Sequence, residues 1–311
     1  MERAIIIIIL VFFGADFNSL FAYDETVHRK ICESAADPRN SLLNEVLTNR
    51  LGFTEGINTE LAKEAKSRTI REWLAFGGEA EDYGYLWKSD PATSRAFNHF
   101  HDPLKDWDEA GLRNAAAELI YYGSYFRLPV SPILWGLNPG EQDYAMNFTG
   151  DWSWGKARRY YYDALTGLTE KEKGQHFADC FRAVGQVLHL LQDMSVPMHT
   201  RNDVHVFPLI KIHGQYPFQR WTYETYTKEC LLKTDLGGLD FAPDKPGDRP
   251  DSRWLEVPAV VLDPTYHHLV PVTGLFDRNV YNQPGAIPQS RSLGLAEFSN
   301  ANFLTQDTMW T

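Results

Sequence analysis

The chain has 311 residues, of which 43% are hydrophobic, 14% aromatic and 23% charged, and its formal net charge is −11. This length and apolar content can bury a sizeable core in one large domain or two small ones. The acidic balance argues against a protein that tracks nucleic-acid phosphates, although bound metal ions can still supply local positive charge for catalysis at a phosphate.

Residues 1–22 have the pattern of a secretory signal peptide. An apolar run from Ala4 to Phe13 follows Arg3, is too short to cross a bilayer, and precedes a cleavage point after Ala22. We therefore expect a secreted or periplasmic protein whose mature chain starts at Tyr23. The alternative is an uncut segment that tethers a helical interaction protein to a membrane. In an oxidising compartment one disulfide can form among the three cysteines, Cys32, Cys180 and Cys230.

Helical patterns dominate the rest of the chain. The first helix is capped within residues 24–26 and carries His28 in its first turns. Further helices are predicted at residues 41–54, 58–76, 108–127, 152–166, 217–232 and 293–303. The second of these is expected to end at Gly77 and Gly78, because glycine commonly closes helices. A loop containing proline and glycine is predicted over residues 129–140.

Two segments between the predicted helices carry candidate metal ligands. One is an acidic cluster at residues 79–82, and the other is Asn-His-Phe-His-Asp at residues 98–102. Imidazole nitrogens and carboxylate oxygens are ligands that zinc takes in proteins. In the second segment His99 and His101 are both candidate ligands by residue type, and for His101 and Asp102 the alternatives are to orient a ligand imidazole or to form only a local turn.

The strongest signal is a His–Asp–His pattern at the end of a long predicted helix. A capping box at residues 169–172 starts this helix, and Pro197 cannot continue it. His189 and Asp193 stand four residues apart, so they project from the same helical face. His199 is expected on a loop past the helix end, where it can fold back towards them. The alternative interpretation of the first two residues is an ordinary side-chain hydrogen bond.

The C-terminal part of the chain differs in composition. The predicted helix over residues 217–232 carries Glu224, whereas residues 237–288 are rich in proline and lose helical periodicity. Strand signals are sparse throughout, so the expected fold class is mainly α. The expected organisation is a helical domain at residues 23–236 and an irregular C-terminal extension packed on it at residues 237–311.

These patterns resemble those of the zinc-dependent phospholipases C and the related single-strand-specific nucleases, which are secreted, mainly α-helical trinuclear zinc phosphodiesterases. The spacing of His189, Asp193 and His199 is similar to the ligand spacing of that superfamily. The segment 98–102 resembles its His-Phe-x-Asp ligand segment. In the nuclease branch the mature chain starts with an aromatic residue and its sixth residue is a zinc-binding histidine. Cleavage after Ala22 gives the same arrangement here.

The resemblance implies a multi-helix bundle of the phospholipase C type that binds about three zinc ions. The first ion would be held by Asp82, His99, His189 and a bridging Asp193. The second would be held by His199, His213 and Glu224. The third would be held by the amine and carbonyl of Tyr23 with His28 and Asp193. Glu79 and Glu81 are alternatives to Asp82, and His205 is the alternative to His213.

The function implied by the resemblance is that of a zinc-dependent phosphoric ester hydrolase. Clustered zinc ions lower the pKa of a water for attack on phosphorus and neutralise charge on the phosphoryl oxygens. Asp193 would bridge the ions, and Asp82 would both ligate and accept the proton of the water. The acidic charge and the lack of a basic–aromatic groove for single strands favour a phospholipase C-like activity on phospholipid, with transient contact with a membrane surface.

Two alternatives to that activity stay open. One is a single-strand nuclease or nucleotidase of the same superfamily, which would act on nucleic acid or nucleotides. The other is a secreted protein that binds zinc without catalysing a reaction. No obligate protein partner is expected from the sequence.

Overall fold

The computed structural model describes residues 25–38, 42–82, 95–113, 128–138, 140–142, 150–201, 272–279 and 293–302. Of the described residues, 61% are helical and 5% are in strands, which confirms the prediction of a mainly α fold. Among the described residues, none of the helices combines the length and the apolar character that a membrane span requires.

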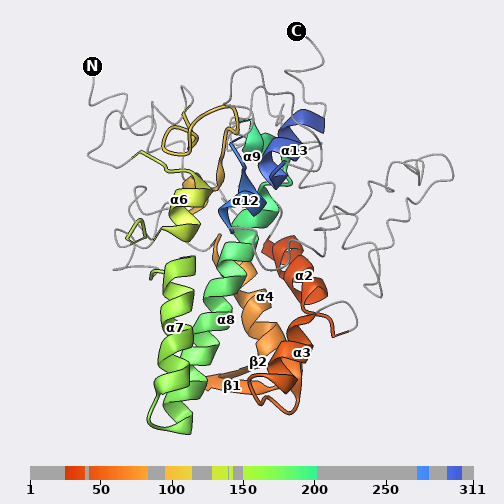
Figure 1. Cartoon of the computed structure of the whole chain (residues 1–311), viewed down its shortest axis with the longest axis vertical. Helices are drawn as coiled ribbons and strands as arrows, with labels where there is room; N and C mark the ends of the chain where they lie inside the picture. Colours follow the sequence, from red (N-terminus) through yellow and green to blue (C-terminus); the bar gives the residue numbers. More distant parts are fainter. Residues whose placement is uncertain are drawn as a thin grey trace, which may run out of the picture.

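The longest helix, α8 (Glu170–Asp193), runs through the middle of the molecule, with α7 (Trp154–Thr166) on one side and α4 (Ile70–Ala80) on the other (Figure 1). Its start confirms the predicted capping box, because the Thr169 side chain accepts from the Glu172 backbone N–H and the Glu172 carboxylate accepts from the Thr169 N–H. The helix ends before Pro197, as expected. This helix therefore carries His189 and Asp193 at its C-terminal end.

The predicted helix over residues 58–76 is wrong in its first half. Strands β1 (Glu60–Lys63) and β2 (Lys66–Thr69) form an antiparallel hairpin there, which Glu64 closes with a φ of 54°. Residues 58–69 are rich in Ala, Glu, Lys and Arg, so composition alone favours a helix. The capping box of Thr69 with Glu72 instead starts α4 only at residue 70.

Gly77 and Gly78 lie inside α4 and do not close it, which corrects the predicted helix end. A Cβ on Gly77 would lie 2.1 Å from the carbonyl oxygen of Arg182, and one on Gly185 of α8 would lie 2.1 Å from that of Leu74. The two helices therefore touch backbone to backbone, and only glycine permits this approach. This contact brings the C-terminal end of α4 close to His189.

The remaining elements are shorter. They are α2 (Glu25–Ala35), α3 (Leu42–Asn49), the 3₁₀ helices η1 (Gly56–Asn58) and η3 (Arg95–His99), α6 (Pro132–Leu137), α9 (Pro197–Thr200), α12 (Thr273–Phe276) and α13 (Leu295–Asn302). Helix α2 carries His28, as predicted, and α3 ends before the expected residue 54.

Three local predictions need correction. The expected loop over residues 129–140 contains α6, because Ser131 caps a helix that has Pro132 at its first position. Residues 108–113 form turns and irregular backbone rather than the start of a helix. His199 lies on the short helix α9 instead of a loop, since proline at the first position of a helix is compatible with helical geometry.

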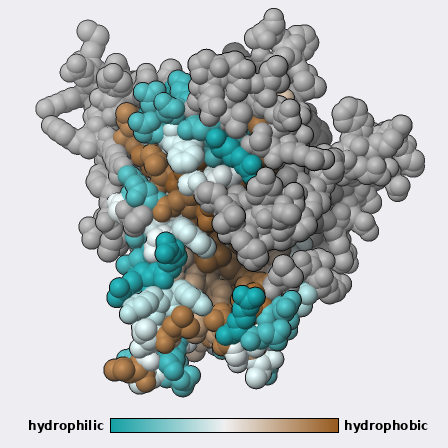
Figure 2. Space-filling model, in the orientation of Figure 1, coloured by the Kyte–Doolittle hydropathy of each residue, from teal (hydrophilic) through white to brown (hydrophobic). Residues whose placement is uncertain are grey.

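Two large apolar clusters make up much of the core of the described residues. One joins α4 to the N-terminal half of α8 and to the hairpin, and includes Ile57, Ile70, Leu74, Ala178 and Phe181. The other joins the C-terminal half of α8 to α6, α12 and α13, and includes Ile133, Leu190, Met194, Phe276 and Ala296. The described parts of the C-terminal extension thus pack against the helical body. Figure 2 shows a band of apolar residues on one face, bordered by hydrophilic ones.

Cys32 and Cys180 are buried free thiols. Cys230 lies outside the described residues, as do the predicted signal segment 1–22 and the predicted helix 217–232. Among the described residues there is therefore no disulfide.

Candidate metal centre

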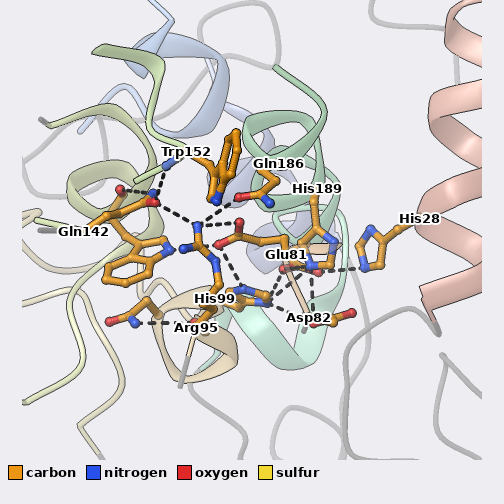
Figure 3. A network of polar contacts seen from close by, with 12 residues as sticks. His28, Glu81, Asp82, Arg95, His99, Gln142, Trp152, Gln186 and His189 are labelled. Carbon is orange, nitrogen blue, oxygen red and sulfur yellow. Dashed lines mark hydrogen bonds and ion pairs between the residues drawn. The ribbon is translucent and has the colours of Figure 1, made fainter. Parts of the chain in front are cut away.

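Five of the predicted ligands meet in one buried cluster. His28 comes from α2, Asp82 follows α4, His99 ends η3, and His189 and Asp193 belong to α8. Each side chain is at most 1% exposed. Two sets of three have one ligand atom apiece within 4.8 Å of one another: His28, Asp82 and His189, and His99, His189 and Asp193. Figure 3 shows His28, Asp82, His99 and His189 converging on one region.

The two helices α4 and α8 set the position of the cluster. His189 and Asp193 lie four residues apart and project from the same face of α8, as the sequence predicts. The close contact at Gly77 and Gly185 places the last turn of α4 beside them. As a result, Asp82 Oδ1 lies 3.5 Å from His189 Nε2, although 107 positions separate them in the numbering.

Three imidazoles are held at Nδ1 by an oxygen acceptor. These contacts are His189 to the Gly78 carbonyl at 2.6 Å, His28 to Gln192 Oε1 at 2.8 Å, and His199 to the His99 carbonyl at 2.8 Å. A carbonyl or amide oxygen can only accept, so Nδ1 carries the hydrogen in each ring. In the neutral form of each ring the lone pair is then on Nε2, which is the arrangement in which a histidine binds a metal ion.

The two aspartates are buried without hydrogen bonds. Among the described residues, neither oxygen of Asp82 or Asp193 has a hydrogen-bond partner. Asp193 nevertheless lies within ion-pair distance of three imidazoles: 3.0 Å from His99 Nδ1, 3.3 Å from His189 Nε2 and 3.4 Å from His28 Nε2. Burial of an unsatisfied carboxylate is unfavourable, and a cation among these groups would satisfy both residues.

The structure distinguishes among the three acidic candidates at residues 79–82. The Glu79 carboxylate accepts from Arg29 Nη1 at 2.6 Å. The Glu81 carboxylate accepts from Arg95 Nη2 at 2.7 Å and from Trp135 Nε1 at 2.8 Å. Asp82 alone faces the imidazoles with both oxygens lacking hydrogen bonds from the described residues. Asp82 is therefore the acidic residue of this segment that the geometry favours as a ligand.

Burial shifts the pKa of these groups in opposite directions. It raises the pKa of Asp82 to about 7, although the imidazoles of His189 and His99 oppose the shift. For Asp193 burial is outweighed, first by the charge of His189, and the pKa falls well below its usual range. Burial lowers the pKa of His28 to about 4, so this ring is neutral near pH 7, the form that binds metal.

His199 lies at the edge of the cluster. Its ring stacks on Phe100 with centroids 4.4 Å apart, and its centroid is 6.5 Å from that of His99. The other residues expected in the second and third zinc sites, Tyr23, His213, Glu224 and the alternative His205, lie outside the described residues.

His101 does not face the cluster through its side chain. Its Nδ1 lies 2.8 Å from Ser131 Oγ and its Nε2 lies 2.9 Å from Asp277 Oδ2. The backbone N–H of His101 donates to the His199 carbonyl at 2.9 Å, which ties the two ligand segments together. The Asp102 side chain accepts from the Leu104 N–H in a local turn, which is the simpler of the two expected roles.

A buried arginine network beside the cluster was not expected from the sequence. Arg95 is 1% exposed, and its Nη2 donates to oxygens of Glu81, Gln142 and Gln186 (Figure 3). Burial opposes ionisation of Glu81, but Arg95 outweighs it and lowers the pKa of the carboxyl to about 2. Glu81 Oε1 lies 3.7 Å from His99 Nε2. One arginine and two glutamines far apart in the chain form no recognisable pattern, so the sequence offered no signal.

No family model, curated protein or solved structure matches this chain. The chemistry of the site is given by its own donor set, in which imidazole nitrogens and carboxylate oxygens surround a shared position in the interior. Such groups can hold a divalent metal ion.

Proposed function

We propose that this chain is a secreted zinc-dependent phosphoric ester hydrolase with a helical bundle of the phospholipase C type. The observation that carries the proposal is the convergence of His28, Asp82, His99, His189 and Asp193. They come from separate elements, they are buried, and both aspartates lack hydrogen bonds among the described residues. A protein without a metal ion would gain little from such an arrangement, because buried carboxylates that lack hydrogen bonds are destabilising.

The donor set fits zinc better than magnesium or calcium. Zinc accepts imidazole nitrogen together with carboxylate oxygen, whereas magnesium and calcium prefer oxygen ligands alone. His28 and His189 present Nε2 because Nδ1 of each ring donates elsewhere. Asp193, which lies near three imidazoles, is suited to bridge two ions. The resemblance to the phospholipase C superfamily extends this to about three zinc ions.

Asp82 and Asp193 would have different roles in the proposed hydrolysis. Zinc would lower the pKa of a water and offset charge on the phosphoryl oxygens. Asp82 would accept the proton of that water, because its carboxylate lies beside His99 and His189 and both of its oxygens lack hydrogen bonds from the described residues. Asp193 stays ionised, because the neighbouring imidazoles keep its pKa low. Without a bound ion, burial raises the pKa of the Asp82 carboxyl to about 7, whereas the pKa of Asp193 is lowered.

The proposed substrate is a phospholipid, and the alternative is a single-stranded nucleic acid or nucleotide. The net charge of −11 favours the phospholipid, because an acidic protein repels the nucleic-acid backbone. A phospholipid substrate implies transient contact with a membrane surface. The nuclease alternative shares the same metal chemistry, so only an assay of the substrates separates the two.

Metal analysis of the purified mature protein tests the proposal together with hydrolysis assays. We expect about three zinc ions per chain and hydrolysis of phosphatidylcholine vesicles that a chelator abolishes and zinc restores. Hydrolysis of single-stranded DNA alone would select the nuclease. Zinc without hydrolysis of either substrate would identify a non-catalytic zinc-binding protein. Absence of bound metal would contradict the whole proposal.

A further inference from the structure

Gln192 lies between two residues of α2 that share one helical face. His28 and Cys32 stand four positions apart on α2. Gln192 of α8 contacts both of them: its Oε1 lies 2.8 Å from His28 Nδ1, and its Nε2 donates to Cys32 Sγ at 3.2 Å. The Gln192 amide therefore joins α2, which carries His28, to α8, which carries Asp193.

The Gln192 amide directs its nitrogen to Cys32 and its oxygen to His28. A side-chain amide has one donor end and one acceptor end. With the nitrogen directed to the sulfur of Cys32, the oxygen is directed to the imidazole. Cys32 itself is held in place by packing, since a Cβ on Gly78 would lie 2.6 Å from its sulfur. The carbonyl of the same Gly78 accepts from His189 Nδ1. Gly78 therefore contacts both the ring of His189 and the cysteine that contacts the Gln192 amide.

The orientation of the amide determines which nitrogen of His28 carries the hydrogen. Nδ1 donates to Gln192, so in the neutral ring the lone pair is on Nε2, which lies 3.4 Å from Asp193 Oδ1. The His28 ring also stacks on His189, with centroids 3.5 Å apart and planes 19° apart. Without the acceptor at Gln192, the hydrogen would be free to move to Nε2, and that tautomer could not bind a cation there.

We propose that Gln192 is a positioning residue of the metal centre, which holds His28 in the tautomer that presents Nε2 to a cation, and that Cys32 anchors its amide. This inference rests on the proposed function, because it assigns a support to one of the proposed ligands. Neither residue touches the reacting atoms. Their effect acts entirely through the ring of His28.

Three substitutions at Gln192 separate positioning from packing. Gln192→Leu keeps the approximate volume but has no acceptor, and Gln192→Ala removes both the acceptor and the volume. Gln192→Glu keeps an acceptor for Nδ1. We expect the Leu and Ala variants to bind one zinc ion about 10–100-fold more weakly, which is the usual effect of losing a ligand's hydrogen-bond partner. The Glu variant should bind it as tightly as the unmodified protein.

The matched control is Asn44→Ala, which removes another amide acceptor far from the cluster. Asn44 Oδ1 accepts from the Ile57 N–H at 2.9 Å. This variant should lose stability and keep its zinc affinity, measured by competition with a chromophoric chelator. Equal zinc affinity in the Leu, Ala and unmodified proteins would overturn the inference.

A second readout is independent of bound metal. In the ¹⁵N NMR spectrum of the metal-free chain, His28 should carry its hydrogen on Nδ1, and Gln192→Leu should abolish this preference while Gln192→Glu restores it. An unchanged tautomer in the Leu variant would contradict the positioning role. If the unmodified chain binds no zinc, the proposed function fails, yet the tautomer still decides whether Gln192 orients His28.

Discussion

At the scale of single residues, the energetics of the site depend on two buried carboxylates. Asp82 and Asp193 are fully enclosed, and the described residues give neither oxygen pair a hydrogen bond. Removing one partner from a buried charged pair typically destabilises a protein by about 3–5 kcal/mol. Imidazoles within about 4 Å reduce this penalty, but a divalent cation would balance both negative charges at once.

Asp193→Asn tests the role of the central carboxylate. The amide has nearly the same shape but no charge, so we expect zinc affinity to fall by more than about tenfold and hydrolysis to fall with it. Zinc content is measured by elemental analysis after dialysis. Asp163→Asn is the control, because Asp163 pairs only with exposed Arg159 among the described residues. Unchanged zinc content in the Asp193 variant would count against the metal centre.

The two described cysteines give a prediction about reactivity. Burial raises the pKa of both the Cys32 and the Cys180 thiols to about 12, so both are protonated at pH 8. We expect iodoacetamide to leave both residues unmodified in the native protein and to label both after denaturation. Peptide mass spectrometry reads each site separately. Rapid labelling of Cys32 in the native state would show that α2 is not packed on Gln192 as described.

At the scale of the elements, two glycines decide how closely α4 approaches α8. A Cβ on Gly185 would meet the Leu74 carbonyl oxygen at 2.1 Å and the Gly77 Cα at 2.9 Å. These are backbone atoms, so a larger side chain cannot be accommodated by rotation alone and the helices must separate. Asp82 and His189 lie on the two sides of this contact, so the spacing of ligands depends on it.

Gly185→Ala should therefore destabilise the protein by about 1–3 kcal/mol and weaken zinc binding. Gly174→Ala on the same helix is the matched control, because no atom lies within 4 Å of its Cβ position. That change should stabilise α8 by roughly 0.5–1 kcal/mol. Urea unfolding of both variants measures the two effects. Equal stability of both variants would show that the helices do not touch at Gly185.

Asp277 links the C-terminal extension to the helical body through side-chain hydrogen bonds. Its carboxylate contacts His101 Nε2 and Trp107 Nε1, both at 2.9 Å, and accepts from the Asn279 N–H at 2.7 Å. His101 in turn donates its backbone N–H to the His199 carbonyl. The extension therefore supports the two segments that carry His99 and His199, and it contributes no ligand from its own described residues.

Asp277→Asn should lower the free energy of unfolding at pH 7 by about 1–3 kcal/mol. Burial opposes ionisation of this carboxyl, but the hydrogen bond from His101 outweighs it and lowers the pKa below 3.8. A lowered native pKa contributes stability above the unfolded value and loses it as the pH falls through the native value. The difference between unmodified and variant protein, measured by urea unfolding, should thus shrink below pH 3.8. A constant difference would contradict this linkage.

At the scale of the whole molecule, local patterns predicted the helical fold class and the long helix, but not the contacts between elements. The start of α8 could be predicted because the capping box and the proline-free run agree. The hairpin at residues 60–69 was missed because its composition favours a helix. Gly77 and Gly78 were interpreted as a helix end, since a sequence does not show that another helix packs against them.

The candidate site was predictable where ligands follow a short spacing, and His28, His99 and Asp82 were added by the resemblance to the phospholipase C superfamily. His189, Asp193 and His199 were found from such spacing, and the structure brings them near His28 and His99. Asp82 could not be separated from Glu79 and Glu81 until their arginine partners were known. Gln192 and Arg95 act through contacts between distant segments, and residues of these types carry no pattern of their own.

The most direct test is a crystal of the mature protein soaked with zinc and measured by anomalous scattering at the zinc absorption edge. We predict a peak within about 2.0–2.3 Å of His189 Nε2 and of carboxylate oxygens of Asp82 or Asp193, and a further peak bound by His28 Nε2. Zinc found only on surface histidines, with the interior cluster empty, would contradict the metal centre and the hydrolase proposed from it.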